Sequence, residues 1–430
     1  MKNKITLTNC IILDGNENMK PKKNMSIVIE NDLISYIGDK PESNDSEIID
    51  LKGKYVLPGL INAHVHLPGN GKPSKRGGRN PDSVKRLMGN PIIYSVIKKM
   101  CAYYGKMELL SGTTTIRTVG GLGKIDSSIR DSVNSGKMIG PRMLVSDMAI
   151  SVPGGHMAGV LAYSAGSPEE CKSYVNKIAE GKPDLIKLMI TGGVLDAKVK
   201  GEPGVLKMPL KYVEAACDEA HKLGFKVAAH TESTEGVLVA LKGGVDTIEH
   251  GAMPNDEIIS LYKEKGAADI CTISPALPLA TFPVEVTNSD ELVQYNGKVV
   301  MDGIIEAAKE CLANDIPVGL GTDTACPFVT HYNMWRELFL FHKYVKVSPS
   351  FALYSATLGN AEILGIENET GSVSVGKSAD LFIANGNPLD DLSILSKPYM
   401  VVFKGKVMRN PKVKKNVEIE KNLDLAFARL

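Results

Sequence analysis

The pattern of apolar and polar positions divides the chain into two alternating end segments and a long middle segment. Near the start, short β-prone runs separated by Asn, Asp, Gly and Pro residues lie at 5–9, 25–29 and 33–38. Similar runs return near the end at 371–376, 379–384 and 400–407. We therefore expect a small β-sandwich domain assembled from both chain ends, residues 1–57 and 369–430.

The middle of the chain alternates between apolar, strand-like runs and amphipathic stretches. Eight strand candidates lie at 60–66, 113–119, 143–150, 185–191, 226–231, 246–250, 269–274 and 318–323. Helical periodicity fills several connections and is clearest at 210–223 and 299–313. Eight strands that each lead into a helix or loop are typical of a (β/α)8 barrel. We therefore expect an α/β fold with a TIM-like barrel over residues 58–368.

Composition narrows the functional classes. The 430 residues are 43% hydrophobic and 23% charged, with a formal net charge of +1. This balance gives no reason to expect nucleic-acid or membrane binding, and no run approaches the roughly 20 apolar residues of a transmembrane helix. The sequence starts without an apolar signal-peptide core, and its seven cysteines include no CxxC pair, so we expect reduced thiols in a cytoplasmic protein. Apolar surfaces could support a homo-oligomer.

Histidines gather at the predicted carboxyl ends of the strands, where a barrel carries its chemistry. His64 and His66 end the first strand two residues apart, so their side chains point to the same side of an extended chain. His230 ends the fifth strand, His250 the sixth and Asp323 the eighth. Four imidazoles and one carboxylate exceed the about four ligands of a tetrahedral zinc site. The sequence therefore predicts a metal centre that could hold two ions if an anion bridges them.

Lys187 lies within the apolar run of the fourth strand, which offers no Asp or Glu at its end. An unpaired buried ammonium is costly and tends to lose its proton. A neutral amine can react with CO2 to give a carbamate, which is an anionic bridging ligand with two oxygens. Alternatively, Lys187 pairs with a nearby carboxylate such as Asp323, and the chemistry alone leaves both readings open.

The ordered motifs resemble the metal-dependent amidohydrolase superfamily, and within it the prolidase-like branch of Xaa-Pro dipeptidases and Xaa-Arg/Lys carboxypeptidases. The resemblance covers nearly the whole chain. The motifs lie at 58–66 (PGLINAHVH), 112–117 (GTTTIR), 154–156 (GGH), 186–193 (IKLMITGG), 227–230 (VAAH), 248–251 (IEHG), 321–323 (GTD) and 376–381 (GKSADL).

The resemblance implies a role for each candidate residue. Two divalent ions, expected to be zinc, would be held by His64, His66 and Asp323 on one side and by His230 and His250 on the other. A carbamate on Lys187 and a hydroxide would bridge them. Asp323 would act first as general base and then as general acid, and His156 would face the substrate and stabilise the oxyanion. The implied reaction is hydrolysis of an amide or peptide C–N bond in a small substrate such as a dipeptide.

Glu232, two residues after His230, departs from the branch, whose members more often carry a small or aromatic residue here. A carboxylate at this place could bind an amino-bearing substrate. A His-x-Glu arrangement also occurs in imidazolonepropionase-like amidohydrolases, so a cyclic-amide hydrolase or deaminase with the same metal cage is the alternative function. Glu232 could instead cap a helix that starts near Ser233. A site with one metal and an unmodified Lys187, and a non-enzymatic role, are further alternatives.

Overall fold

The computed structural model describes residues 4–41, 46–73 and 80–430, and the chain forms two compact units. The first unit comprises Met1–Asn62, Lys106–Ile116 and Tyr332–Lys415. The second comprises Ala63–Gly105, Arg117–His331 and Asn416–Leu430. Each unit is therefore built from segments that are far apart in the sequence.

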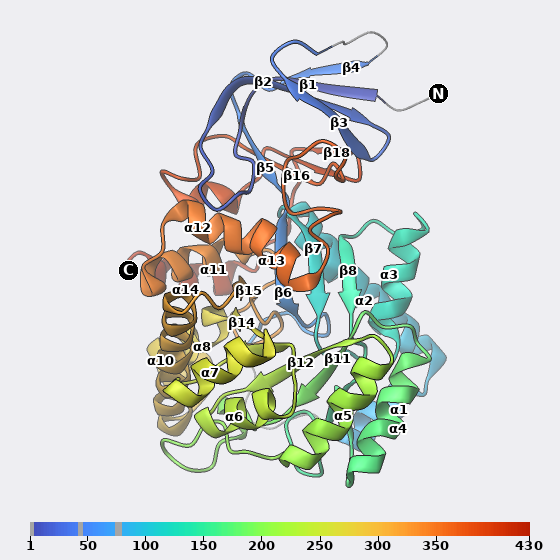
Figure 1. Ribbon diagram of the computed structural model, residues 1–430, viewed down its shortest axis with the longest axis vertical. Coiled ribbons are helices and arrows are strands. Elements are labelled where there is room, and N and C mark those ends of the chain that lie inside the picture. Colours follow the sequence, from blue (N-terminus) through green and yellow to red (C-terminus); the bar gives the residue numbers. More distant parts are fainter. Residues whose placement is uncertain (1–3, 42–45, 74–79) are drawn as a thin grey trace. The chain divides into compact units, whose positions relative to one another are not determined.

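An eight-stranded sheet forms the first unit (Figure 1). Seven strands follow the order β18–β17–β16–β5–β1–β2–β3, and β4 pairs with β1. Their bounds are β1 Lys4–Ile12, β2 Lys22–Glu30, β3 Leu33–Gly38, β4 Glu47–Asp50, β5 Tyr55–Pro58, β16 Leu381–Ala384, β17 Met400–Phe403 and β18 Lys406–Arg409. The pairs β1–β4 and β1–β5 are parallel and the others are antiparallel.

The two chain ends meet where β5 pairs antiparallel with β16. This pairing confirms that both ends contribute to one β-structure, whose buried core includes Leu7, Ile27 and Ile383. Strands β2 and β3 are joined by a hairpin turn, with Asn31 at φ 60°. Residues 371–376 turn instead of forming the expected strand, because the backbone at Gly371 and Gly376 has positive φ.

Short helices complete the first unit. They are α11 Met334–Leu340, α12 Pro349–Tyr354 and α13 Asn360–Leu364, with wider helical turns at Phe341–Val345 and Ser355–Gly359. Helix α2 (Pro91–Leu110) begins in the second unit and ends in the first. None of the helices in the described part of the chain is both long enough and apolar enough to cross a bilayer.

The second unit carries a seven-stranded sheet in the order β10–β9–β11–β12–β13–β14–β15, in which all pairs are parallel. Its strands are β9 Ala149–Ser151, β10 Ala162–Ser164, β11 Leu185–Met189, β12 Lys226–Thr231, β13 Thr247–His250, β14 Ala268–Cys271 and β15 Val318–Leu320. A three-stranded sheet contains β6 Leu60–Val65, β7 Thr113–Thr118 and β8 Arg142–Val145. Strands β11, β13 and β14 are buried throughout, as parallel strands covered on both faces must be.

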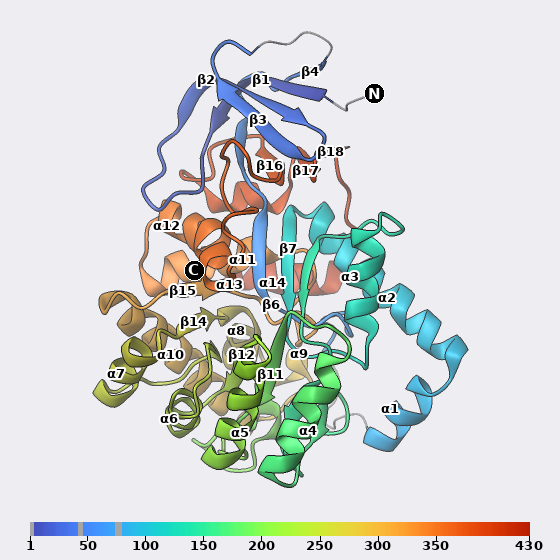
Figure 2. The same ribbon diagram turned by 45° about the vertical axis from the view of Figure 1, so that its right-hand side comes forward.

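Helices follow most of the strands of the parallel sheet. Helices α4 Pro168–Ala179, α5 Leu210–Lys222, α6 Thr234–Lys242 and α7 Asp256–Lys265 lie in a row beside the strands that they connect (Figures 1 and 2). Ser167, Ser233 and Asn255 start three of them by accepting a backbone N–H bond in the first turn. The remaining helices of this unit are α1 Pro81–Met88, α3 Ile125–Asn134, α8 Ile273–Thr281, α9 Val284–Thr287, α10 Glu291–Ala313 and α14 Val417–Phe427.

The observed architecture is mixed α/β with parallel strands, and each of the eight predicted strand regions contains a strand. The region 143–150 is the exception in detail, because it holds two strands, β8 and β9, which belong to different sheets. Asp147 lies between them with φ 54°, and this left-handed backbone interrupts the extended chain.

Candidate metal centre

The predicted ligands all lie in the second unit, at or near the carboxyl ends of its strands. His64 lies in β6, and His66 follows the end of that strand. In the parallel sheet, Met189 of β11 pairs with His230 of β12, and Thr231 pairs with His250 of β13. The matching register brings the strand ends, and the histidines on them, to one edge of the sheet.

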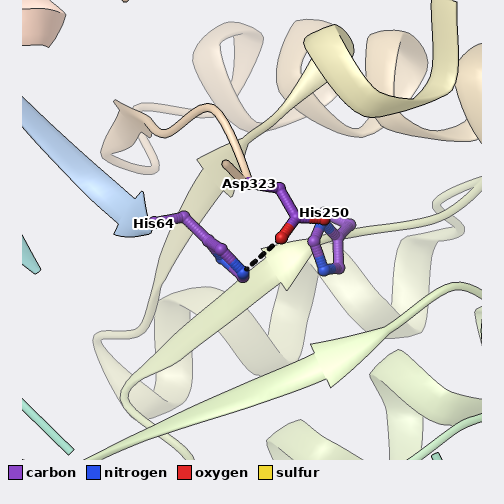
Figure 3. Close-up of side chains that lie close together, drawn as sticks. All are labelled: His64, His250 and Asp323. Carbon is purple, nitrogen blue, oxygen red and sulfur yellow. Dashed lines mark ion pairs between the residues drawn. The ribbon is translucent and has the colours of Figure 1, made fainter. Parts of the chain in front are cut away.

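One group of candidate ligands consists of His64, His250 and Asp323, whose ligand atoms lie within 4.8 Å of one another. Figure 3 shows these three side chains pointing toward a common centre from separate segments of the chain. His64 Nε2 lies 3.4 Å from Asp323 Oδ1, and His66 Nε2 lies 3.3 Å from the same oxygen. Asp323 Oδ1 therefore faces both imidazoles of the His-x-His pair.

A second group consists of His230, Glu232 and His250, again with ligand atoms within 4.8 Å of one another. His250 belongs to both groups, so the two groups form one continuous set of donors. The sequence predicted Glu232 as a substrate-binding residue and not as a metal ligand, so its place among these donors is an additional finding.

The Nδ1 atoms of three imidazoles each lie within hydrogen-bond distance of a neighbouring oxygen. His64 Nδ1 lies 2.7 Å from Glu249 Oε2, His66 Nδ1 lies 2.8 Å from Gly120 O, and His250 Nδ1 lies 2.7 Å from Thr272 Oγ1. Such partners fix the orientation of a ligating imidazole and leave its Nε2 for a metal. For His64 and His66, the Nε2 atoms do turn toward Asp323.

Next to His64 lies a buried ion pair that no sequence motif predicted. Arg117 donates from Nη2 to Glu249 Oε1 at 2.7 Å, from Nη1 to Thr247 and from Nε to the carbonyl oxygen of Ala63. Burial alone would raise the pKa of Glu249, but the positive charges of Arg117 and Lys187 hold this pKa well below its ordinary value. Glu249 is therefore a carboxylate that can orient His64.

Lys187 is 1% exposed, and its Nζ has no hydrogen-bond partner among the described residues. Burial lowers the pKa of Lys187 to about 8, although the carboxylate of Glu249 opposes this effect. The carboxylate pairing that the sequence left open is thus not formed as a hydrogen bond. A buried amine without a hydrogen-bond partner requires an explanation, such as a catalytic role or a bound ion.

Burial and neighbouring charges keep the imidazoles of His230 and His250 neutral, and neighbouring imidazoles keep Asp323 ionised. Burial holds the pKa values of His230 and His250 well below the ordinary value, and the neighbouring imidazoles and Lys187 add to this effect. Burial would raise the pKa of Asp323, but His64 and His66 hold it well below its ordinary value. Neutral imidazole and ionised carboxylate are the protonation states that bind a divalent cation.

His156 lies in the connection between β9 and β10, and its ring stacks on that of His230 with centroids 4.4 Å apart and planes 6° apart. Its Nδ1 forms a hydrogen bond with the Asp196 carboxylate. The structure thus brings His156 to the donor groups, with a partner that fixes its ring.

Glu232 does not cap helix α6, because Ser233 is the N-cap residue of that helix. The carboxylate of Glu232 instead accepts a hydrogen bond from the backbone N–H of Val194 at 2.8 Å. Burial, assisted by the negative charge of Asp323, raises the pKa of Glu232 to about 8. Near neutral pH this group can therefore carry a proton.

Two of the proposed ligands have left-handed backbones. His250 has φ 72° and Asp323 has φ 55°, a conformation that non-glycine residues adopt infrequently. Backbone strain of this kind persists where the surroundings over-determine it, and it is concentrated at functional sites. No sequence pattern indicated it.

Comparisons with known proteins identify the family of the chain. The model of the amidohydrolase family matches residues 55–408. The chain is similar to the crystal structure of a provisionally assigned prolidase from Bifidobacterium longum, with 35% identity, a TM-score of 0.87 and coverage of 99% of each chain. It is 23% identical to ochratoxinase from Aspergillus niger over 92% of this chain and 85% of that protein. It is also 23% identical to imidazolonepropionase from Picrophilus torridus over 91% of this chain and 92% of that protein.

Proposed function

The chain belongs to the amidohydrolase family and is a hydrolase of C–N bonds, and from this premise we propose that it cleaves a peptide-like amide bond. Enzymes of this family are generally metal-dependent and act on small substrates. The observation that carries the proposal is the set of His, Asp and Glu side chains that meet at the strand ends of the second unit, with Lys187 buried within strand β11. The substrate we propose is a dipeptide or a similar small amide.

The donor set fits two divalent ions, for which we propose zinc. His64, His66 and Asp323 would hold one ion, and His230 and His250 would hold the other. The buried amine of Lys187 supports this assignment, because its Nζ has no hydrogen-bond partner in the described part of the chain and a bound group could satisfy it. When bound, divalent ions lower the pKa of water and polarise the carbonyl of the scissile bond.

We propose that Lys187 carries a carbamate that bridges the two ions. The neutral amine adds to CO2 and loses one proton, which gives a negatively charged group with two ligand oxygens. A pKa of about 8 leaves an appreciable neutral fraction of Lys187 near neutral pH. Starting from the protonated lysine, two protons are released in all, one to form the neutral amine and one on addition to CO2, so a buried cation is replaced by an anion that bound cations would compensate.

Asp323 and His156 would perform the proton transfer and the charge stabilisation. Asp323 is held as a carboxylate, so it can accept a proton from the attacking water and then deliver it to the leaving amine. His156 lies against His230, and its Nδ1 is held by Asp196, which leaves Nε2 for the oxygen of the scissile carbonyl.

Glu232 supports a second candidate function. It lies beside His230 and His250 and can carry a proton near neutral pH, so it can exchange a proton with a ring nitrogen as well as bind an amino group. Hydrolysis of a cyclic amide, or deamination, is therefore the alternative, and the similarity to imidazolonepropionase is compatible with it. Both candidates use the same metal ligands.

We further propose that the strands close into a (β/α)8 barrel over residues 58–368, and that residues 1–57 and 369–430 form a β-sandwich. The approach of the eighth strand region to the first supports closure. The backbone N–H of Asp323 donates to the carbonyl of His64 at 2.9 Å, and a Cβ on Gly321 would lie 2.4 Å from His64 Cβ. The seven cysteines are free thiols, which agrees with the proposed cytoplasmic location, and a homo-oligomer stays a prediction.

The test combines metal analysis with a substrate panel. Purified protein is assayed for bound metal, and dipeptides are compared with lactams while ammonia release is monitored. His64→Asn should lose metal and activity together while the fold is kept. His221→Asn is the matched control. His221 is exposed on helix α5, and its ring is bound to Asp246, the residue before strand β13. Wild-type turnover and metal content in His64→Asn would refute the assignment, and lactam hydrolysis without dipeptide hydrolysis would select the alternative.

A further inference from the structure

Cys326 is the one cysteine of the seven whose side chain is not fully buried. Its Sγ lies 3.2 Å from Asp323 Oδ2, at which distance the thiol donates a hydrogen bond to the carboxylate. The other carboxylate oxygen, Oδ1, faces the Nε2 atoms of His64 and His66 at 3.4 Å and 3.3 Å. The two oxygens of Asp323 therefore have different partners.

The backbone around Cys326 is a compact turn. The N–H of Cys326 donates to the carbonyl of Asp323 at 3.3 Å, and the N–H of Val329 donates to the carbonyl of Cys326 at 2.9 Å. Asp323, Ala325 and Phe328 all have positive φ, at 55°, 78° and 66°. Three non-glycine residues in this conformation within six positions require surroundings that hold the turn in one shape.

The segment after β6 supplies these surroundings. Thr324 Oγ1 accepts from the backbone N–H of His66 and donates to the carbonyl of the same residue, both at 3.1 Å. The N–H of Phe328 donates to the carbonyl of Gly71 at 2.6 Å. A Cβ on Gly69 would lie only 2.4 Å from Ala325 Cβ, so the two segments are in close contact. The turn therefore presents the Cys326 thiol to Asp323 at a fixed position.

We propose that Cys326 is a positioning residue for Asp323, which it holds through Oδ2 so that Oδ1 points at the imidazoles of His64 and His66. This inference rests on the proposed function, in which Asp323 transfers the proton. A thiol is a weak donor, so it can fix the plane of the carboxylate and still leave Oδ2 able to accept a proton. The rival explanation is a cysteine that only fills space in the turn.

The first experiment compares Cys326→Ala with Cys326→Ser on the metal-loaded enzyme. The alanine variant should lower kcat about tenfold, as expected for loss of one hydrogen bond to a charged group, with KM and metal content unchanged. The serine variant keeps a donor and should recover most of the loss. Cys10→Ala is the control, because the Cys10 thiol also lies 3.2 Å from an oxygen, the carbonyl of Met25 in the sheet of the first unit, and its kcat should be that of the wild type.

Three kinetic outcomes overturn the proposal. One is wild-type kcat in Cys326→Ala, and another is a change in KM alone, which would make Cys326 a substrate contact. The third is an equal loss in the serine and alanine variants at full metal content, which would point to packing.

A second experiment does not require a known substrate. The infrared S–H stretch of Cys326 is isolated by subtracting the spectrum of Cys326→Ala from that of the wild type. Repeating the subtraction in Asp323→Ala should move the band to higher wavenumber, because the acceptor has been removed. An unmoved band overturns the proposal. A moved band in a protein that binds metal but hydrolyses no amide would instead refute the proposed function and leave the contact intact.

Discussion

At the scale of single residues, the site contains three charged side chains in the interior of its strands. Arg117 and Glu249 satisfy each other through a 2.7 Å hydrogen bond, whereas Lys187 is buried with no hydrogen-bond partner among the described residues. A buried charge without a partner is destabilising, and a paired one costs far less. Stability measurements can therefore separate the paired charges from the unpaired lysine.

Replacing Lys187 with Met should stabilise the metal-free protein while it abolishes metal bridging and activity. The pKa of Lys187 falls from 10.5 to about 8 in the folded state, so at neutral pH the protonated lysine opposes folding by about 3 kcal/mol. Because the unfolded chain binds the extra proton between these values, wild-type stability rises from pH 8 toward pH 10.5. The gain from Lys187→Met should therefore shrink over this range.

Denaturant unfolding of chelated protein at several pH values measures this effect. Lys172→Met is the control, because Lys172 is exposed on helix α4, and its free energy of unfolding should change by less than about 0.5 kcal/mol. A loss of stability in Lys187→Met would contradict the view that Lys187 is an uncompensated charge.

Glu249→Gln should be strongly destabilising. It leaves the guanidinium of Arg117 buried without a carboxylate, which typically costs about 3–5 kcal/mol. The amide oxygen can still accept from His64 Nδ1, so metal affinity should fall by no more than about 10–100-fold. Thermal unfolding and metal titration measure the two effects separately.

Two controls apply to Glu249→Gln. One changes an exposed salt bridge, and the other changes Arg117, the ion-pair partner of Glu249. Glu257→Gln removes an exposed salt bridge with Lys242 and should change stability by less than about 1 kcal/mol. Arg117→Met combined with Glu249→Gln should recover part of the loss. If the double variant is no more stable than Glu249→Gln, the unpaired guanidinium is not the cause.

The sequence allowed the candidate metal ligands to be predicted but not the residues that hold them in place. His64, His66, His230, His250 and Asp323 could be found because each stands at the end of an apolar run. Lys187 stands out as a charge inside such a run, and Arg117 and Glu249 carry the same signal in their own strands. Cys326 gave no signal, because its role depends on the left-handed turn that brings its thiol back to Asp323.

At the scale of elements, the C-terminal helix α14 supports the turn that follows Asp323. Ile419 and Leu423 of this helix are buried in one cluster with Phe282 and Phe328. Phe328 belongs to the turn that carries Cys326, so the helix packs against a segment that positions the site.

Leu423→Ala should therefore affect both stability and catalysis. It removes a side chain that is 4% exposed, which should cost about 2–4 kcal/mol of unfolding free energy. It should also lower kcat more than it changes KM, because the Asp323 turn loses support. Leu425→Ala on the same helix is the control, since that side chain is 53% exposed and its loss should change stability little. Equal effects of the two variants would show that α14 is not docked through this face.

Element prediction succeeded where one physical signal dominated. Apolar runs located the strands, and helical periodicity located α5 and the second half of α10. It failed where backbone conformation decided the outcome: Asp147 splits 143–150 into two strands, and glycines turn 371–376. For Glu232, the alternative role as a helix cap is wrong, because its carboxylate accepts from the Val194 N–H and Ser233 is the N-cap residue.

At the scale of the whole molecule, the donor groups lie in the second unit, whereas the strands from both parts of the chain, β1–β5 and β16–β18, lie in the first. The sequence pattern predicted that both ends share one β-structure, which the pairing of β5 with β16 confirms. It could not show that Lys106–Ile116 and Tyr332–Lys415 group with the chain ends, because such grouping depends on long-range packing. The predicted domain limits at 57/58 and 368/369 stay a prediction.

This division predicts where metal removal acts. A bound ion stabilises only those states in which its ligands remain assembled, and ligand at a thousandfold excess over its Kd contributes about 4 kcal/mol. All the proposed ligands lie in the second unit, so chelation should speed amide exchange at the ends of β12 and β13 and in the turn at 323–329. Strands β1, β2 and β16 of the first unit should keep their protection, because their hydrogen bonds do not involve the donor groups.

Hydrogen exchange followed by mass spectrometry tests this, with zinc re-addition as the control. Equal loss of protection in β1 and β13 would mean that the two units unfold as one, and no change in either would mean that the donor groups hold no ion.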